Sequence, residues 1–275
     1  MNAGEVFICA GVESMSRVIM GGLNPMPNPA LLESNPAAYI SMGETAENVG
    51  KEFNISREEQ EQFAVLSQQK AADAQSQGKL EQEIVPIQMN GLTVDTDGCL
   101  RPGTSAEDLA SLKLAFDENG SVTAGTSSPL TDGAAATLVC SETYAQENGL
   151  EPIARIKSIA VSGCKPETMG LGPIFASRKA LARAELSADA IDVVEINEAF
   201  ATQSIASVRD LDLDIDKVNI DGGAIAIGHP LGATGARITG KDAQLLKREG
   251  GRYALSTQCI GGGQGIATVL ETVGT

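Results

Sequence analysis

The only histidine of the chain and one of its five cysteines lie in glycine-rich loops. Backbone in such loops can approach a ligand closely. His229 follows Gly228 and precedes a predicted helix, a setting that favours proton transfer or ligand binding over a histidine satisfied by backbone in a turn. Cys259 ends a predicted strand beside Gly261, where free N–H groups can stabilise a thiolate or an oxyanion. The alternative for Cys259 is a small buried cysteine in a tight turn.

A third candidate, Asn197, follows the predicted strand 191–196 and precedes a predicted helix. The carboxyl ends of strands in α/β sheets are where ligands bind. Taken alone, however, Asn197 is interpreted as a helix N-cap, because asparagine is among the preferred residues there.

Two nucleotide-binding motifs, zinc sites and a disulfide framework are disfavoured. Gly235, Gly240 and Lys241 match the spacing G-x-x-x-x-G-K, but Asp242 stands where a P-loop needs serine or threonine. The glycines around His229 lack the G-x-G-x-x-G spacing of dinucleotide folds. Five widely spaced cysteines without a C-x-x-C pair, together with one histidine, argue against zinc and against a disulfide framework.

Charge and hydropathy argue against nucleic-acid and membrane partners. The 275 residues include 20 basic and 36 acidic side chains, a formal charge of −16 that repels phosphate backbones and anionic lipid. We therefore expect no nucleic-acid partner. No apolar run approaches membrane-spanning length and the first residues lack a basic region, so we expect no membrane insertion and a cytoplasmic location.

Hydrophobic periodicity predicts an α/β protein. A capping-box sequence starting at Ser56 predicts a helix that ends near Gly78. Glu5–Ala10 reads as a buried strand that stops at Gly11, and Cys9, Cys140 and Cys164 are expected to be buried. Further strands are predicted over 134–140, 153–161, 191–196, 253–257 and 266–270, and helices over 176–184, 200–208 and 233–248.

Three motifs in order along the chain resemble the C-terminal signatures of the thiolase family: Asn197-Glu198-Ala199-Phe200, Gly228-His229-Pro230 and Cys259-Ile260-Gly261. Further segments are similar to thiolase motifs over nearly the whole chain. They are Gly11-Val12-Glu13-Ser14-Met15-Ser16, Met42-Gly43-Glu44-Thr45-Ala46-Glu47, Arg101-Pro102-Gly103-Thr104, Leu112-Lys113-Leu114-Ala115-Phe116, Val122-Thr123-Ala124-Gly125-Thr126-Ser127-Ser128 and Asp132-Gly133-Ala134-Ala135.

The resemblance implies a layered α-β-α-β-α fold built from two related halves, with a loop domain inserted in the first half. On this basis residues 1–17 are a remnant of the N-terminal half, 18–120 the inserted loop domain, 121–147 the last part of the N-terminal half and 148–275 the C-terminal half. The N-terminal half is then incomplete, and we expect part of its core surface to be uncovered.

The implied activity is acyl transfer between coenzyme A thioesters, either thiolysis of a 3-ketoacyl-CoA or the reverse Claisen condensation. Cys259 would be the general base at C2, with its thiolate favoured by the nearby amides, so that it alkylates faster than Cys9 or Cys140. His229 would activate the nucleophile and donate to the thioester oxygen. Asn197 would hold a water as second donor, and the Gly261 amide would serve the other oxyanion hole.

Other implied roles concern the substrate. Ser128, Met42 and Phe200 match positions that line the pantetheine channel. Coenzyme A would be substrate or product, with no covalently bound cofactor and no metal. Acyl-CoA thioesters are the expected small-molecule partners, and the expected protein partner is either a second copy in a homo-oligomer or a complementing N-terminal thiolase segment.

Two departures from the thiolase pattern shape the expected activity. The family's acylated cysteine lies in a C-x-S-G-x-x-A segment before the motif that starts here at Gly11, and the chain contains no such segment. Cys9 lies within the predicted strand and cannot replace it. Ser41 also stands where many thiolases have histidine.

Three readings follow from these departures. The chain is a thiolase without its nucleophile segment, predicted inactive alone, or a non-catalytic fragment or subunit that needs a partner carrying the nucleophile. A decarboxylating condensing enzyme needs two histidines or a His-Asn pair around its nucleophile, and it is disfavoured by the single histidine and the Asn197-Glu198-Ala199-Phe200 signature.

Overall fold

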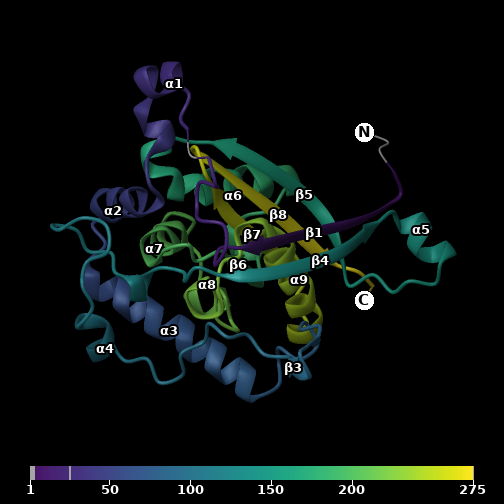
Figure 1. The fold of residues 1–275 in the computed structure, drawn as a ribbon. Helices are drawn as coiled ribbons and strands as arrows, with labels where there is room; N and C mark the ends of the chain where they lie inside the picture. Colours follow the sequence, from purple (N-terminus) through teal and green to yellow (C-terminus); the bar gives the residue numbers. More distant parts are fainter. Residues whose placement is uncertain (1–3, 25, 275) are drawn as a thin grey trace.

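A computed structural model describes residues 4–24 and 26–274 and forms two sheets on either side of one long helix, α9 (Figure 1). The four-stranded sheet has the order β5-β8-β7-β6, in which only β6 and β7 are parallel. The two-stranded sheet pairs β1 with β4 antiparallel. The strands are β1 (Val6–Ser14), β4 (Asp132–Cys140), β5 (Ala154–Gly163), β6 (Val193–Ile196), β7 (Tyr253–Ile260) and β8 (Gln264–Thr272).

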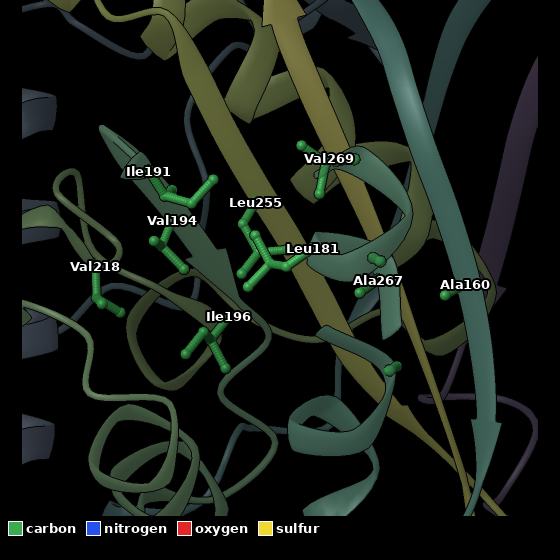
Figure 2. Packing of buried hydrophobic residues seen from close by; sticks show 12 residues of the cluster. Ala160, Leu181, Ile191, Val194, Ile196, Val218, Leu255, Ala267 and Val269 are labelled. Carbon is green, nitrogen blue, oxygen red and sulfur yellow. The ribbon is translucent and has the colours of Figure 1, made fainter. Parts of the chain in front are cut away.

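The two faces of the four-stranded sheet are covered by different helices. Along β6, Val194 packs with residues of α6 (Gly172–Ala184), while Val193 packs with Leu245 of α9 (Leu231–Glu249). Because successive strand residues point to opposite faces, this alternation places α6 and α9 on opposite sides of the sheet. Figure 2 shows the core on the α6 side, where Leu181 lies among Leu255, Ile196 and Val269.

Helix α9 also packs against β1 and β4, so the layers run helix, sheet, helix, sheet. The contact is close at Gly11, where an added Cβ would lie 1.8 Å from the Gly232 carbonyl oxygen. Only glycine allows the strand to approach the helix backbone this closely. The predicted layered α/β fold is therefore confirmed.

The outer face of the β1–β4 sheet is exposed. Ile8, Val12 and Leu138 are 77%, 75% and 56% exposed, respectively, and no helix among residues 4–24 and 26–274 covers them. The expected uncovered core surface is present. The expectation that β1 is buried and ends at Gly11 is wrong, because the strand continues to Ser14 in register with β4, and in it only Gly11, Glu13 and Ser14 are partly buried.

Most of the chain between β1 and β4 is helical or irregular. Its elements are α1 (Pro29–Ser34), α2 (Met42–Glu52), α3 (Arg57–Ser76), α4 (Ala106–Ala110) and the hairpin β2 (Ile87–Met89) and β3 (Leu92–Val94). The remaining helices are α5 (Glu142–Glu147), α7 (Ala201–Asp210) and α8 (Ala224–Ile227), with 3-10 helices over Pro36–Tyr39, Ala124–Thr126, Pro166–Leu171, Ala188–Ala190 and Ile215–Lys217. The division of the chain into domains stays a prediction.

Helix starts follow local capping chemistry. Ser56 caps α3 with the predicted capping box to Glu59. Ser41, where many thiolases have histidine, forms a second capping box: its hydroxyl accepts from the Glu44 N–H at 3.3 Å and donates to Glu44 Oε2 at 2.7 Å. This serine therefore has a clear structural role at the start of α2.

The structure corrects two further expectations. Strand β7 runs three residues beyond the predicted end at Thr257, so Cys259 lies inside the strand. Cys9 is exposed, whereas Cys140 and Cys164 are partly buried.

In the part of the chain that the structure describes, no helix has both the length and the apolar character needed to cross a bilayer.

Candidate active site

Cys259 lies opposite Gly265 in the β7–β8 ladder. Burial raises the pKa of its thiol to about 12. The expectation that nearby amides favour the thiolate is wrong in this structure, because lost hydration outweighs the one backbone hydrogen bond that lowers the pKa. The expectation that Cys259 alkylates faster than Cys9 is therefore also wrong, because the Cys259 thiolate is disfavoured and Cys9 is exposed.

Gly261 follows the end of β7 in the turn before β8. It is exposed, and an added Cβ would meet nothing within 4 Å. Its carbonyl accepts from Gln264 Nε2 at 3.2 Å, which holds the turn. Open space thus lies beside this backbone, and the role of the Gly261 amide in an oxyanion hole stays a prediction.

Asn197 is completely buried at the carboxyl end of β6, and both side-chain atoms lack a hydrogen-bond partner among the described residues. Its backbone N–H donates to the Thr257 carbonyl at 3.0 Å. The N-cap interpretation is wrong, because α7 starts at Ala201 with Phe200 as its cap. A buried amide without partners is rare and is suited to hold a water or a substrate oxygen.

Glu198 connects the Asn197 segment to the loop that leads to His229. Its carboxylate accepts from Ser67 Oγ at 2.6 Å, Asn219 Nδ2 at 2.7 Å and the Ile225 N–H at 3.1 Å. Burial raises the pKa of Glu198, and these hydrogen bonds oppose that shift. We assign Glu198 a structural role, because its oxygens are occupied by protein donors.

His229 is held by two threonine hydroxyls. The backbone N–H of His229 donates to Thr131 Oγ1 at 3.0 Å, and the ring Nδ1 lies 2.6 Å from Thr234 Oγ1. Gly228 before it has φ +94°, and an added Cβ would lie 2.6 Å from Thr131 Cγ2, so this turn requires glycine. The alternative of a histidine satisfied only by backbone is wrong.

These contacts set the protonation of the ring. Burial lowers the pKa of His229 to about 4, so the ring is neutral at pH 7. When the Thr234 hydroxyl donates to the Pro230 carbonyl at 3.3 Å, its oxygen is available to accept from Nδ1–H. This tautomer leaves the Nε2 lone pair free to take a proton.

The three predicted channel residues lie on segments that contact one another. Phe200 makes an edge-to-face contact with Phe116, with centroids 5.9 Å apart. The Phe116 ring lies against Gly43, where an added Cβ would be 2.1 Å away, next to Met42 at the start of α2. The Ser128 N–H donates to the Ala199 carbonyl at 2.9 Å. The segments that carry Met42, Phe200 and Ser128 are thus connected through Phe116 and the Ala199 carbonyl, and the role of the three residues in substrate binding stays a prediction.

A cluster of buried charges lies on the α9 side of β6. Glu195 and Asp242 are 1% and 0% exposed, and Glu195 Oε1 and both Asp242 oxygens lack partners among the described residues. Burial raises the pKa of Glu195 to about 8 and raises that of Asp242, to which the Glu195 charge adds. Lys241, which lies inside α9, pairs instead with Asp221 and Glu83, both at 2.5 Å.

The structure brings the candidates into two groups. Cys259 and Asn197 are linked through Gln203, which lies 3.8 Å from the Cys259 sulfur, with Gly261 in the following turn. His229 lies by the segment that carries Ser128, which in turn contacts the Asn197–Phe200 segment. Sequence reasoning missed Gln203 and Thr234, and the signal available was a polar residue a few positions after each motif. No set of three or more His, Cys, Asp or Glu side chains suited to a metal ion occurs in residues 4–24 and 26–274.

Comparison with known proteins identifies the class. Residues 150–272 match the thiolase C-terminal domain family and residues 1–143 match the thiolase N-terminal domain family. The chain therefore belongs to the thiolase family.

Individual relatives are similar over nearly the whole chain. A 3-ketoacyl-CoA thiolase of Alcanivorax borkumensis is 49% identical over 98% of this chain and 71% of its own length. An acetyl-CoA acetyltransferase of Shinella zoogloeoides is 45% identical over 98% of this chain and 72% of its own length. The crystal structure of human mitochondrial 3-ketoacyl-CoA thiolase superposes with a TM-score of 0.90 and is 41% identical, covering 99% of this chain and 73% of that chain. The crystal structure of the same enzyme in complex with CoA superposes with a TM-score of 0.89 and is 42% identical, covering 98% of this chain and 71% of that chain.

Proposed function

We propose that this chain provides the C-terminal catalytic residues for acyl transfer between coenzyme A thioesters. The observation that carries the proposal is the pair of a neutral His229 ring and an unpartnered Asn197 amide on two segments that both hydrogen-bond to residues 128–131. Relatives named 3-ketoacyl-CoA thiolase and a CoA complex of a similar structure support it. Coenzyme A enters as substrate or product.

Each residue has a defined task in thiolysis. His229 Nε2 takes the proton of the attacking thiol. The sulfur of that thiol then receives the acyl group as the C2–C3 bond of the 3-ketoacyl-CoA breaks. The electron pair passes to C2 of the departing acetyl-CoA, and the Cys259 S–H supplies the proton there. A thiol whose pKa is raised by burial is protonated at pH 7, the form that this direction requires. Asn197 and Gly261 donate to the developing oxyanions.

The nucleophile is proposed to come from a thiolase-type segment with a C-x-S-G-x-x-A motif, either joined to this chain or on a partner. The exposed Ile8, Val12 and Leu138 of the β1–β4 sheet offer an apolar surface for such a segment. The second candidate function is binding of acyl-CoA without turnover. A homo-oligomer and a cytoplasmic location remain proposals that rest on the sequence.

Calorimetry of the chain with acetyl-CoA tests the substrate site. We expect weak, saturable binding, because His229, Ser128 and Phe200 are present. The variants His229→Ala and Ser128→Trp should each weaken binding by roughly tenfold or more, since the first removes the imidazole ring with its hydrogen-bonding nitrogen and the second fills the channel. Ser76→Trp, at the exposed end of α3, is the matched control and should bind as the unmodified chain does. Binding that neither site variant alters would place the ligand elsewhere.

A further inference from the structure

Gln203 is a buried polar side chain between two of the candidate catalytic residues. It lies on the first turn of α7 and is 1% exposed. Its terminal amide faces the Cys259 sulfur at 3.8 Å, and it also faces the backbone carbonyl of Asn197. No other polar side chain in the described ranges hydrogen-bonds to the Cys259 sulfur.

The hydrogen bonds around Gln203 determine which end of its amide faces the sulfur. With the nitrogen toward Asn197, it donates to the Asn197 carbonyl at 3.0 Å, while the oxygen accepts from Ser204 Oγ at 2.9 Å and from the Ser204 N–H at 2.7 Å. The opposite orientation would place two acceptors against each other. The nitrogen therefore occupies the position 3.8 Å from Cys259 Sγ.

We propose that Gln203 is a positioning residue of the active site, whose amide N–H₂ holds the Asn197 carbonyl with one hydrogen and stabilises the Cys259 thiolate with the other. The inference rests on the proposed role of Cys259. When the Cys259 S–H gives its proton to C2 of the departing acetyl-CoA, a negative charge remains on a buried sulfur. An amide nitrogen 3.8 Å from that sulfur can donate to it and stabilise the charge without a rearrangement.

The surroundings explain why such a donor matters. Burial is the main cause of the raised pKa of Cys259, and the neighbouring thiol of Cys164 raises it further. Cationic side chains are absent from the groups that act on this thiol in the described structure. A neutral donor therefore has to supply the stabilisation, and Gln203 is placed to do so because the same amide also fixes the loop of Asn197.

The test follows alkylation of Cys259 by iodoacetamide against pH in the full chain, with peptide mapping to assign each cysteine. Only the thiolate reacts, so the rate at a given pH reports the thiolate fraction. Gln203→Met keeps the shape but removes the donor, and we expect Cys259 to react about tenfold more slowly, which is about one pKa unit. Gln203→Glu adds a carboxylate beside the sulfur and should slow it further. The rate of the exposed Cys9 should not change.

Controls separate this role from packing. Gln60→Met removes another buried glutamine amide, which donates to Ser121 Oγ, and should leave the Cys259 profile unchanged. Ser204→Ala removes only the hydroxyl that orients the Gln203 amide and should give a smaller slowing, which keeps the test decisive if Gln203→Met fails to fold. Profiles of the Gln203 and Ser204 variants that superimpose on the unmodified chain would overturn the inference. Turnover is not measured, so this outcome is independent of the proposed activity.

Discussion

The 275-residue chain, purified by itself, is expected to show no measurable CoA-dependent cleavage of a 3-ketoacyl-CoA. Thiolase chemistry needs a cysteine that carries the acyl group between two half-reactions. Burial raises the pKa of both Cys259 and Cys164, and Cys9 lies on the exposed strand β1. The hydrogen bonds of His229 in the described structure go to Thr131 and Thr234, and none goes to a cysteine. Without the acylated residue, the other groups lose nearly all their catalytic effect.

Complementation completes this test. A thiolase segment with the C-x-S-G-x-x-A motif, fused to the chain or added as a separate polypeptide, should restore cleavage. The restored activity should fall by roughly a hundredfold or more in His229→Ala and in Cys259→Ser, since each removes a proton-transfer group. The same segment with its cysteine changed to alanine is the matched control. Strong cleavage by the isolated chain would contradict the prediction and would mean that one of its own five cysteines is the nucleophile.

The second large effect is a loss of stability as pH rises through the range set by the buried carboxyl groups. Burial raises the pKa of Glu195 from an ordinary 4.5 to about 8, and it raises that of Asp242 as well. The folded chain therefore binds more protons than the unfolded chain between these values, so the free energy of unfolding falls as pH rises toward 8. Burial lowers the pKa of His229 from its ordinary 6.5 to about 4, so this residue makes the free energy of unfolding rise with pH, but only up to about pH 6.5. The carboxyl groups alone should dominate from about pH 6.5 to 8.

Urea unfolding at several pH values measures this slope. Each such proton contributes up to about 1.4 kcal/mol per pH unit. Arg237 and Lys241 lower the pKa of Glu195, whereas Glu198 and Glu83 raise it, so the slope belongs to the cluster as a whole. Glu195→Gln should flatten the curve by about one proton and stabilise the fold most at pH 8, because it removes a buried charge.

Glu151→Gln, at an exposed position, is the control and should keep the slope of the unmodified chain. If Glu195→Gln and the unmodified chain give parallel curves from pH 6.5 to 8, Glu195 ionises as it would in water. The proton-binding role of the cluster would then be refuted.

Local signals in the sequence predicted the elements well, and tertiary burial decided the rest. The capping box at Ser56 and the alternating strands needed only neighbouring residues to be recognised. The state of Cys259 did not follow from the glycines beside it, because its pKa depends on the enclosure of β7 by other elements. The N-cap prediction for Asn197 fails because α7 starts four residues later. Gln203 could not be identified, because its orientation depends on Asn197, Ser204 and Cys259 together.

The pairing of β1 with β4 has a consequence for the order in which the chain folds. Ser14 and Asp132 close this ladder across 118 positions (132 − 14), whereas Ile260 and Gln264 close β7 on β8 across four (264 − 260). The longer loop loses about 3 kcal/mol more closure entropy. Contacts of such high sequence separation form late, so the β7–β8 hairpin is expected to form first and β1–β4 to dock on α9 afterwards. In native-state hydrogen exchange, the β1–β4 amides should open at a lower free energy than those of β7 and β8.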